Sequence, residues 1–147
     1  MAADALLAVR DLTKRFAGIC AMDGVSFTVG RGRVHAVIGP NGAGKTTLLG
    51  ILSTLVRATD GRVRYRSARG ELDGAAVRKE IGMLAHASLC YGELSAVENL
   101  ELVAGLYGVD GGARVIGAML DRVGLEPKAR ERAARTYSRG MLQRLAL

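Results

Sequence analysis

Cysteine, proline and aromatic residues are all scarce in this chain of 147 residues. It contains two cysteines, two prolines and no tryptophan, and aromatic residues make up 4% of it. Cys20 and Cys90 are too few for a disulfide framework, and with only two histidines they lack the clustered spacing of a zinc site. We therefore expect both cysteines to be small buried or half-buried residues. The chain also lacks the interleaved aromatic and basic residues that single-stranded nucleic-acid binders use to stack bases.

Long hydrophobic runs and a secretory signal are missing as well. The longest apolar stretch, residues 48–56, is interrupted by small and polar residues and is too short to span a bilayer. The first residues include Asp4 and no basic segment, so no secretory signal is predicted. A hydrophobic fraction of 49% is typical of a globular protein, and the length suffices for one domain with its own core. These features predict a cytoplasmic protein.

The net charge is +7, from 21 basic and 14 acidic residues. A basic balance is compatible with binding to nucleic acid or to an anionic membrane surface. Several arginines lie near the end of the chain, and we interpret them as a solvated helix face. These residues are Arg130, Arg132, Arg135, Arg139 and Arg144.

One glycine-rich stretch has a pattern with a definite chemistry, G-x-x-x-x-G-K-T, the phosphate-binding loop. The predicted nucleotide-binding residues are Gly39, Pro40, Asn41, Gly42, Ala43, Gly44, Lys45, Thr46 and Thr47. The glycines let successive backbone N–H groups point into one concavity, which a phosphate chain fills. Lys45 adds a positive charge toward the β- and γ-phosphates, and the Thr46 hydroxyl is placed to bind Mg²⁺.

The residues on either side of this loop predict that it joins a strand to a helix. Residues 34–38 are mostly apolar and β-branched, which is typical of a buried parallel strand. Apolar residues then recur with the helical period to about Val56, at Leu48, Ile51, Leu52 and Leu55. The N-terminal amides and dipole of this helix favour an anion at the loop.

The remaining pattern divides the chain into a strand-rich part and a helical part. Further strands are predicted at residues 6–12, 25–29, 62–65 and 81–84. Ser95 and Glu98 form a capping-box pattern, which predicts a helix that runs to about Tyr107. A second helix is predicted over residues 113–123 and a third over residues 138–147. We therefore expect an α/β core followed by an inserted helical subdomain.

A second motif precedes the last of these helices, where Ser138 and Gly140 form a helix N-terminus that can hold phosphate. With this S-x-G-x-x-Q pattern and the phosphate loop, the whole chain resembles the nucleotide-binding subunit of an ATP-binding-cassette (ABC) transporter. In that family the signature motif acts in trans, on the nucleotide of a second subunit. The corresponding residues here are Ser138, Arg139, Gly140, Met141 and Gln143. The motif departs from the common Leu-Ser-Gly-Gly-Gln at Tyr137, Arg139 and Met141.

The resemblance implies a P-loop NTPase (RecA-like) α/β core with an N-terminal antiparallel β region and an inserted helical subdomain. Residues 1–147 would form a partial nucleotide-binding domain, with the core at 1–84, a Q-loop-like segment at 85–94 and the helical subdomain at 95–147. The implied ligands are ATP and Mg²⁺. Phe16 occupies the position of an aromatic residue that stacks on adenine, and its alternative is an ordinary core residue. His86 stands where the family has the Q-loop glutamine, and it is otherwise a loop histidine with no role.

In function, the resemblance implies an ATP-hydrolysing motor subunit, peripheral on the inner face of the cell membrane. Its partners would be a transmembrane permease subunit and a second nucleotide-binding subunit, in a homo- or heterodimer, and nucleic acid is not expected. Residues 86–100, 106–108 and 137–141 look most like the haem exporter ATPase of cytochrome c maturation, and drug and polysaccharide exporters share parts of this pattern. Two alternatives are a soluble ABC ATPase that acts on nucleic acid or ribosomes, and a small P-loop kinase.

In this family an apolar strand ending in Asp-Glu, the Walker B site, follows the signature helix, and a switch histidine comes later. Residues 1–147 contain neither. We therefore interpret the sequence as a truncated, N-terminal part of a longer ATPase. Because the group that polarises the attacking water is missing, we expect residues 1–147 alone not to hydrolyse ATP. Apart from His86, no catalytic residue is assigned.

Overall fold

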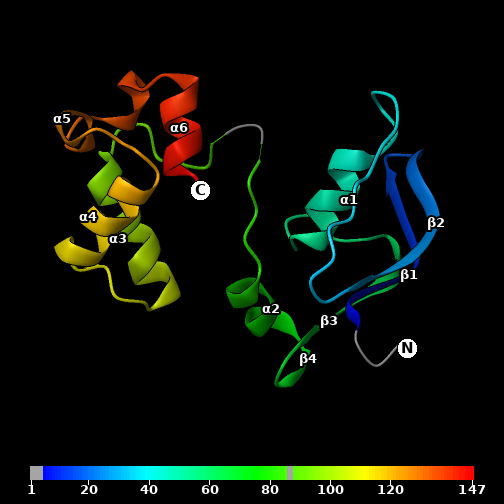
Figure 1. Ribbon diagram of the computed structural model, residues 1–147. Coiled ribbons are helices and arrows are strands. Elements are labelled where there is room, and N and C mark those ends of the chain that lie inside the picture. The colour runs from blue at the N-terminus through cyan, green and yellow to red at the C-terminus, as the bar shows by residue number, and fades with distance from the viewer. Residues whose placement is uncertain (1–4, 86–87) are drawn as a thin grey trace. The chain divides into compact units, whose positions relative to one another are not determined.

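The computed structural model describes residues 5–85 and 88–147. The chain divides into two compact units, Met1–Gly82 and Met83–Leu147 (Figure 1). Each unit has a hydrophobic cluster of its own.

A four-stranded antiparallel sheet and two helices form the first unit. The strands are β1 (Ala5–Phe16), β2 (Ile19–Gly30), β3 (Asp60–Ser67) and β4 (Gly70–Leu72), in the spatial order β2-β1-β3-β4. The helices are α1 (Lys45–Leu52) and α2 (Gly74–Glu80).

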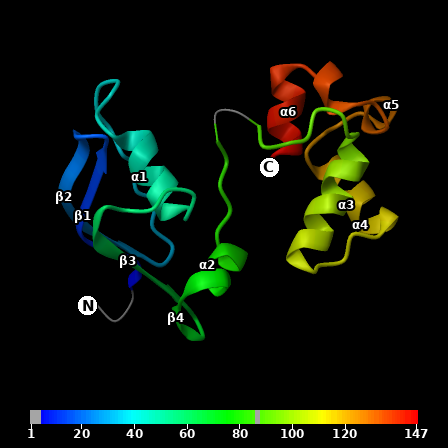
Figure 2. The ribbon, with the colours of Figure 1, turned by 180° about the vertical axis from the view of Figure 1, so that it is seen from behind.

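Helix α1 covers one face of this sheet (Figures 1 and 2). Because side chains alternate between the faces of a strand, Val9 and Val63, which are cross-strand partners, both point toward α1. They pack with Leu48 and Ile51 of the helix, and Leu12 of β1 is completely buried. The predicted N-terminal antiparallel β region, with a helix after the phosphate loop, is confirmed.

Two strand predictions are wrong. Residues 34–38 and 81–84 adopt no regular secondary structure, and the described part of the chain contains no strand that pairs with either segment. Val34 is 99% exposed and Ile38 91% exposed, so these apolar side chains are not in a core. A strand forms only where a neighbour accepts its hydrogen bonds, and an apolar, β-branched composition does not provide that neighbour.

Helices make up the second unit. They are α3 (Ala96–Tyr107), α4 (Ala113–Arg122), α5 (Pro127–Arg130), the short 3₁₀ helix η1 (Ala134–Thr136) and α6 (Arg139–Leu145). Their cluster is built around Ile116, Leu120 and Leu125, which are almost fully buried. The helices predicted from Ser95 to Tyr107 and over residues 113–123 are confirmed within one residue.

The predicted capping box is present at the start of α3. The Ser95 hydroxyl accepts a hydrogen bond from Glu98 N at 3.2 Å, and Glu98 Oε2 accepts one from Ser95 N at 2.7 Å. One turn further, the buried Asn99 side chain bonds the segment before the helix: it accepts from Tyr91 N and donates to the carbonyls of Tyr91, Leu94 and Ser95. These contacts fix residues 91–95 to α3.

The capping box makes stability depend on pH. The backbone N–H and the hydroxyl of Ser95 hold the pKa of Glu98 below its ordinary value of 4.5. Because the folded-state pKa is lowered, the carboxylate stabilises the fold fully above about pH 4.5, and this contribution is lost as the pH falls through the folded-state pKa. We expect Glu98→Gln to lower the melting temperature at neutral pH and to flatten its acid dependence. Melting curves measured between neutral and acidic pH test this, and parallel pH profiles would contradict it.

The two cysteines differ. Cys90 is half-buried beside the core of the second unit, as predicted. The expectation for Cys20 is wrong, because it is exposed. It lies opposite Arg15 near the tip of the β1–β2 hairpin.

Candidate functional site

The phosphate-binding loop is shaped by two glycines with left-handed backbone conformations. Gly42 has φ 84° and Gly44 has φ 83°, values that side-chain-bearing residues rarely adopt. Gly44 also lies against β2, since a Cβ atom on it would be 2.5 Å from the carbonyl oxygen of Ala21. The sequence therefore needs glycine at position 44 for two independent reasons, backbone conformation and close approach of a strand.

Helix α1 begins directly in this loop, with Gly44 as its N-cap. The first bond of its helical ladder joins Leu48 N to Gly44 O at 2.8 Å, so the N–H groups of Lys45, Thr46 and Thr47 precede the ladder. Gly44 offers no side chain to cap them, and the first turn of α1 carries no acidic residue. The positive end of the helix is thus available to an anion.

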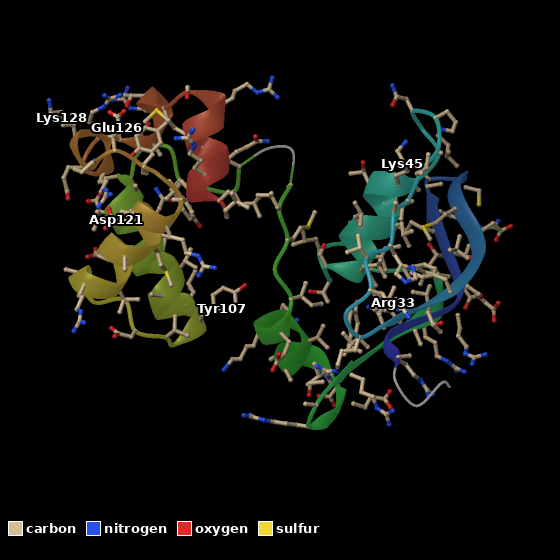
Figure 3. All side chains as sticks on the ribbon, in the orientation of Figure 1. Arg33, Lys45, Tyr107, Asp121, Glu126 and Lys128 are labelled. Carbon is tan, nitrogen blue, oxygen red and sulfur yellow. The ribbon has the colours of Figure 1, made fainter. Side chains whose placement is uncertain are left out.

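Lys45 closes the loop on itself. Its ammonium group donates hydrogen bonds to the carbonyl oxygens of Gly39 and Pro40, at 2.7 and 2.6 Å. Figure 3 shows Lys45 at the loop end of α1. The side chain therefore holds its charge over the loop, where the sequence predicts the β- and γ-phosphates.

The donor set fits a phosphate chain with an accompanying Mg²⁺. Thr46 is exposed, so its hydroxyl is accessible as a ligand, and its N–H is one of the three that precede the helical ladder. Within residues 5–85 and 88–147 no three His, Cys, Asp or Glu side chains are grouped to hold a metal. A cation at Thr46 would accordingly take most of its ligands from the phosphates and from water.

Phe16 ends β1 and is 46% exposed, which leaves much of its ring accessible. The Lys14 ammonium lies 4.6 Å from the ring centroid, a cation–π contact. Its stacking role stays a prediction.

The signature segment lies in the second unit and begins α6. Ser138 is the N-cap, and its hydroxyl accepts a hydrogen bond from Met141 N at 3.3 Å. Ser138, Arg139, Gly140 and Gln143 are exposed, whereas Met141 is half-buried against the core. The motif therefore presents its serine and glycine on the surface of this unit. His86, the proposed Q-loop substitute, lies outside the described residues.

Tyr137 anchors the signature segment. The sequence showed only that a tyrosine replaces the family's leucine at this position, and it did not predict this role. Tyr137 is 8% exposed, and its hydroxyl donates a hydrogen bond of 2.6 Å to the carbonyl oxygen of Ala129. Burial raises the pKa of the phenol, so it stays protonated as a donor.

We expect Tyr137→Phe to destabilise the second unit by about 1 kcal/mol, because the Ala129 carbonyl loses its partner while the ring still fills the core. Urea denaturation followed by circular dichroism measures the change. Tyr107→Phe is the control, since Tyr107 is 45% exposed. Equal effects of the two substitutions would show that the buried hydrogen bond contributes nothing.

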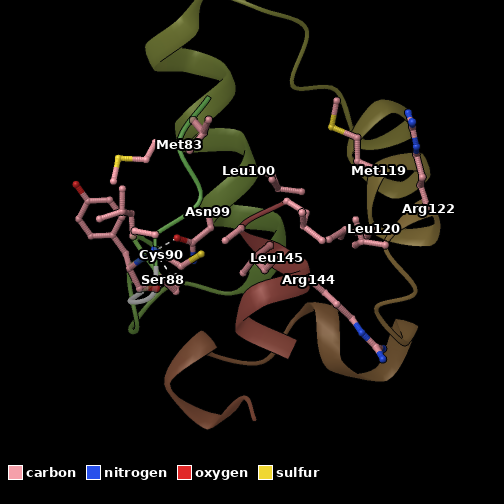
Figure 4. A pocket seen from close by; sticks show the side chains of 17 residues that line it. Met83, Ser88, Cys90, Asn99, Leu100, Met119, Leu120, Arg122, Arg144 and Leu145 are labelled. Carbon is pink, nitrogen blue, oxygen red and sulfur yellow. Dashed lines mark hydrogen bonds between the residues drawn. The ribbon is translucent and has the colours of Figure 1, made fainter. Parts of the chain in front are cut away.

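A groove of about 890 Å³ opens within the second unit (Figure 4). Its lining is mainly apolar and includes Leu89, Val103 and Met119, which are 70%, 47% and 52% exposed. Ser88 to Tyr91, from the predicted Q-loop-like segment, form part of the wall. No pattern in the sequence predicted this groove, because it depends on how the apolar residues of α3 and α4 are divided between core and surface.

Comparison with known proteins identifies the family. The family described as "ABC transporter" matches residues 22–147, which include both the phosphate loop and the signature segment. The chain belongs to the ABC transporter family.

Curated relatives of this ABC ATP-binding domain have several substrates in their names. The chain is 40% identical to a daunorubicin resistance ATP-binding protein of Streptomyces coeruleorubidus over 149 aligned positions, which cover 99% of this chain and 46% of that protein. It is 34% identical to a cytochrome c biogenesis ATP-binding export protein of Cupriavidus metallidurans, covering 99% of this chain and 68% of that protein. The chain therefore spans about half of the first of these relatives.

A solved ATP-binding cassette, a dimer in a post-hydrolysis state with ADP and Pi, has the same fold. It superposes with a TM-score of 0.76 and 25% sequence identity, covering 95% of this chain and 66% of that one. This match confirms the predicted fold class. Within the described residues, no helix of this ABC domain is long and apolar enough to cross a membrane.

Proposed function

We propose that this chain is the ATP-binding part of the motor subunit of an ABC transporter that exports its substrate across the cytoplasmic membrane. The observation that carries the proposal is the phosphate loop. Its glycines have left-handed backbone conformations, it leads into the uncapped N-terminus of α1, and the Lys45 side chain bonds back to it. The family match and the ADP-bound structural relative support ATP as the ligand.

In this proposal the triphosphate lies along residues 39–47. The N–H groups at the start of α1 and the Lys45 ammonium compensate its charge. To do so, Lys45 exchanges its bonds to the Gly39 and Pro40 carbonyls for phosphate oxygens. Mg²⁺, held through Thr46, would neutralise charge that develops on the β- and γ-phosphates. Phe16 would stack on the adenine ring with the accessible part of its own.

The signature segment would complete the site of a second subunit. Ser138 and Gly140 are exposed at the start of α6, where they can meet a nucleotide held by a partner. Binding of ATP between two copies would then favour a closed dimer, and this difference in affinity would drive the permease between its states.

A mixing experiment tests the action in trans. Lys45→Ala and Ser138→Ala should each abolish most ATP hydrolysis by the purified ATPase with its permease. When the two variants are mixed and allowed to exchange subunits, the heterodimer contains one intact site, so phosphate release should recover in part. If the mixture stays inactive although heterodimers form, the signature segment does not act in trans.

The permease partner would use the apolar groove of the second unit. Its wall includes the Q-loop-like segment, which in this family touches the membrane subunit, and its exposed apolar side chains suit an amphipathic helix. Met119→Asp should prevent co-purification with the permease, while Arg114→Asp, exposed on the same helix, should not. Retained binding by Met119→Asp would exclude the groove.

The substrate proposed first is haem, as in cytochrome c maturation, and a drug of the daunorubicin type is the second candidate. The relatives named above support both, and residues 86–100 favour the first. The protein would work at the inner face of the membrane. A soluble ABC ATPase acting on nucleic acid or ribosomes is the alternative, and recovery of the protein with ribosomes rather than with a permease would favour it.

A further inference from the structure

The positive charge of this chain is concentrated in its first unit. Met1–Gly82 contains 13 basic and 7 acidic residues, whereas Met83–Leu147 contains 8 and 7. The first unit thus carries a net +6 of the total +7. The late arginines that stand out in the sequence are nearly balanced by neighbouring carboxylates, two of which pair with Arg130 and Arg135.

Strand β3 places a row of arginines on the face of the sheet opposite α1. Its sequence alternates, so that Val63 points into the core while Arg62, Arg64 and Arg66 point the other way. The register puts Arg10 of β1 directly opposite Arg62. We call this surface, made by Arg10, Arg62, Arg64 and Arg66, the basic face.

Carboxylates of the chain neutralise only part of the basic face, where Glu71 of β4 lies directly opposite Arg66. Among the described residues, neither Arg10 nor Arg62 has a carboxylate partner, and like charges directly opposite each other destabilise a sheet. Arg64 approaches Glu71 only at 3.7 Å, with both side chains about half exposed. An external anion would relieve this repulsion.

A polar hollow of about 470 Å³ continues the basic face at the end of the sheet where β1 begins and β3 ends. Arg66 belongs to both the face and the hollow. Arg31, which follows β2, and Arg69, in the β3–β4 turn, also line the hollow, together with Ser67. Cationic side chains therefore extend from β1 and β3 to the segment after β2 and the β3–β4 turn, rather than along a single strand.

From this arrangement we infer that the basic face binds the surface of an anionic phospholipid bilayer. A planar array of guanidinium groups matches a planar array of headgroup phosphates, whereas a linear polyanion would engage only one row. Arginine also recognises phosphate oxygens in a bidentate manner. The positions of β1 and β3 on this face are Leu6, Ala8, Arg10, Arg62, Arg64 and Arg66, and they include no aromatic ring for stacking bases.

Co-sedimentation with lipid vesicles tests the inference. The purified protein should bind vesicles of equimolar phosphatidylglycerol and phosphatidylcholine at low salt, should be released at high salt, and should not bind pure phosphatidylcholine. Each basic residue near such a surface changes the affinity about fivefold, so Arg10→Gln/Arg62→Gln should weaken binding roughly 30-fold. The melting temperature of this double variant should not fall, because the two substitutions remove a pair of like charges that repel each other.

The matched control is Arg114→Gln/Lys128→Gln, which removes the same charge from exposed positions of the second unit (Figure 3 labels Lys128). It should bind vesicles like the unmodified protein. Equal losses in both variants, or tighter binding to a DNA duplex than to the anionic vesicles, would overturn the inference. Lys45→Ala should retain vesicle binding, so a failure of the proposed ATPase function would be seen separately.

Discussion

Lys45→Ala is expected to weaken the binding of a fluorescent ATP analogue by about 10- to 100-fold. The substitution removes the ammonium group held over the loop by the carbonyls of Gly39 and Pro40. A charge-assisted hydrogen bond of this kind contributes about 1.5–3 kcal/mol, which corresponds to the stated loss. Fluorescence anisotropy in the presence of Mg²⁺ measures the dissociation constant.

The control for this experiment is Lys79→Ala, which removes the same charge from an exposed position of α2 in the same unit. It should leave the dissociation constant unchanged, because Lys79 lies outside the phosphate-binding loop, residues 39–47. If Lys45→Ala binds as tightly as the control, residues 39–47 do not hold the nucleotide's phosphates, and the proposed function is wrong.

Gly61→Ala should be the most disruptive single substitution in the sheet, costing about 3–5 kcal/mol or preventing folding of the first unit. Gly61 has φ 79°, and a Cβ atom on it would lie 2.3 Å from the carbonyl oxygen of Asp11 and 2.6 Å from that of Arg10. These are backbone atoms, so β1 and β3 would have to separate. Since a whole domain is stable by about 5–15 kcal/mol, the loss is a large part of the total.

Gly18→Ala separates the two causes of this loss. Gly18 has φ 90° in the β1–β2 turn, but nothing lies within 4 Å of an added Cβ atom. It should cost only the conformational part, about 1–2 kcal/mol. Urea denaturation followed by circular dichroism compares both variants, and similar losses would show that the close approach of Gly61 to β1 relaxes without cost.

The sequence alone determined the features that depend on neighbouring residues. The G-x-x-x-x-G-K-T spacing predicted the loop and the helix at Lys45, because glycine conformations and a helix start are local. Ser95 and Glu98 predicted their mutual capping for the same reason. Ser138 was predicted at a helix N-terminus, and it caps α6.

Only the tertiary structure decided where apolar segments go. The periodicity of apolar residues predicted that α1 runs to about Val56, but the helix ends at Leu52. The Gly50 carbonyl accepts the N–H groups of Leu55 and Val56, and the chain turns so that Val56 packs against the sheet. Likewise, residues 34–38 have a strand composition, but no strand in the described part of the chain pairs with them. Whether such a segment forms a strand depends on partners that are distant in sequence. Arg62 is a further example, because its position opposite Arg10 comes from the strand register, which composition does not encode.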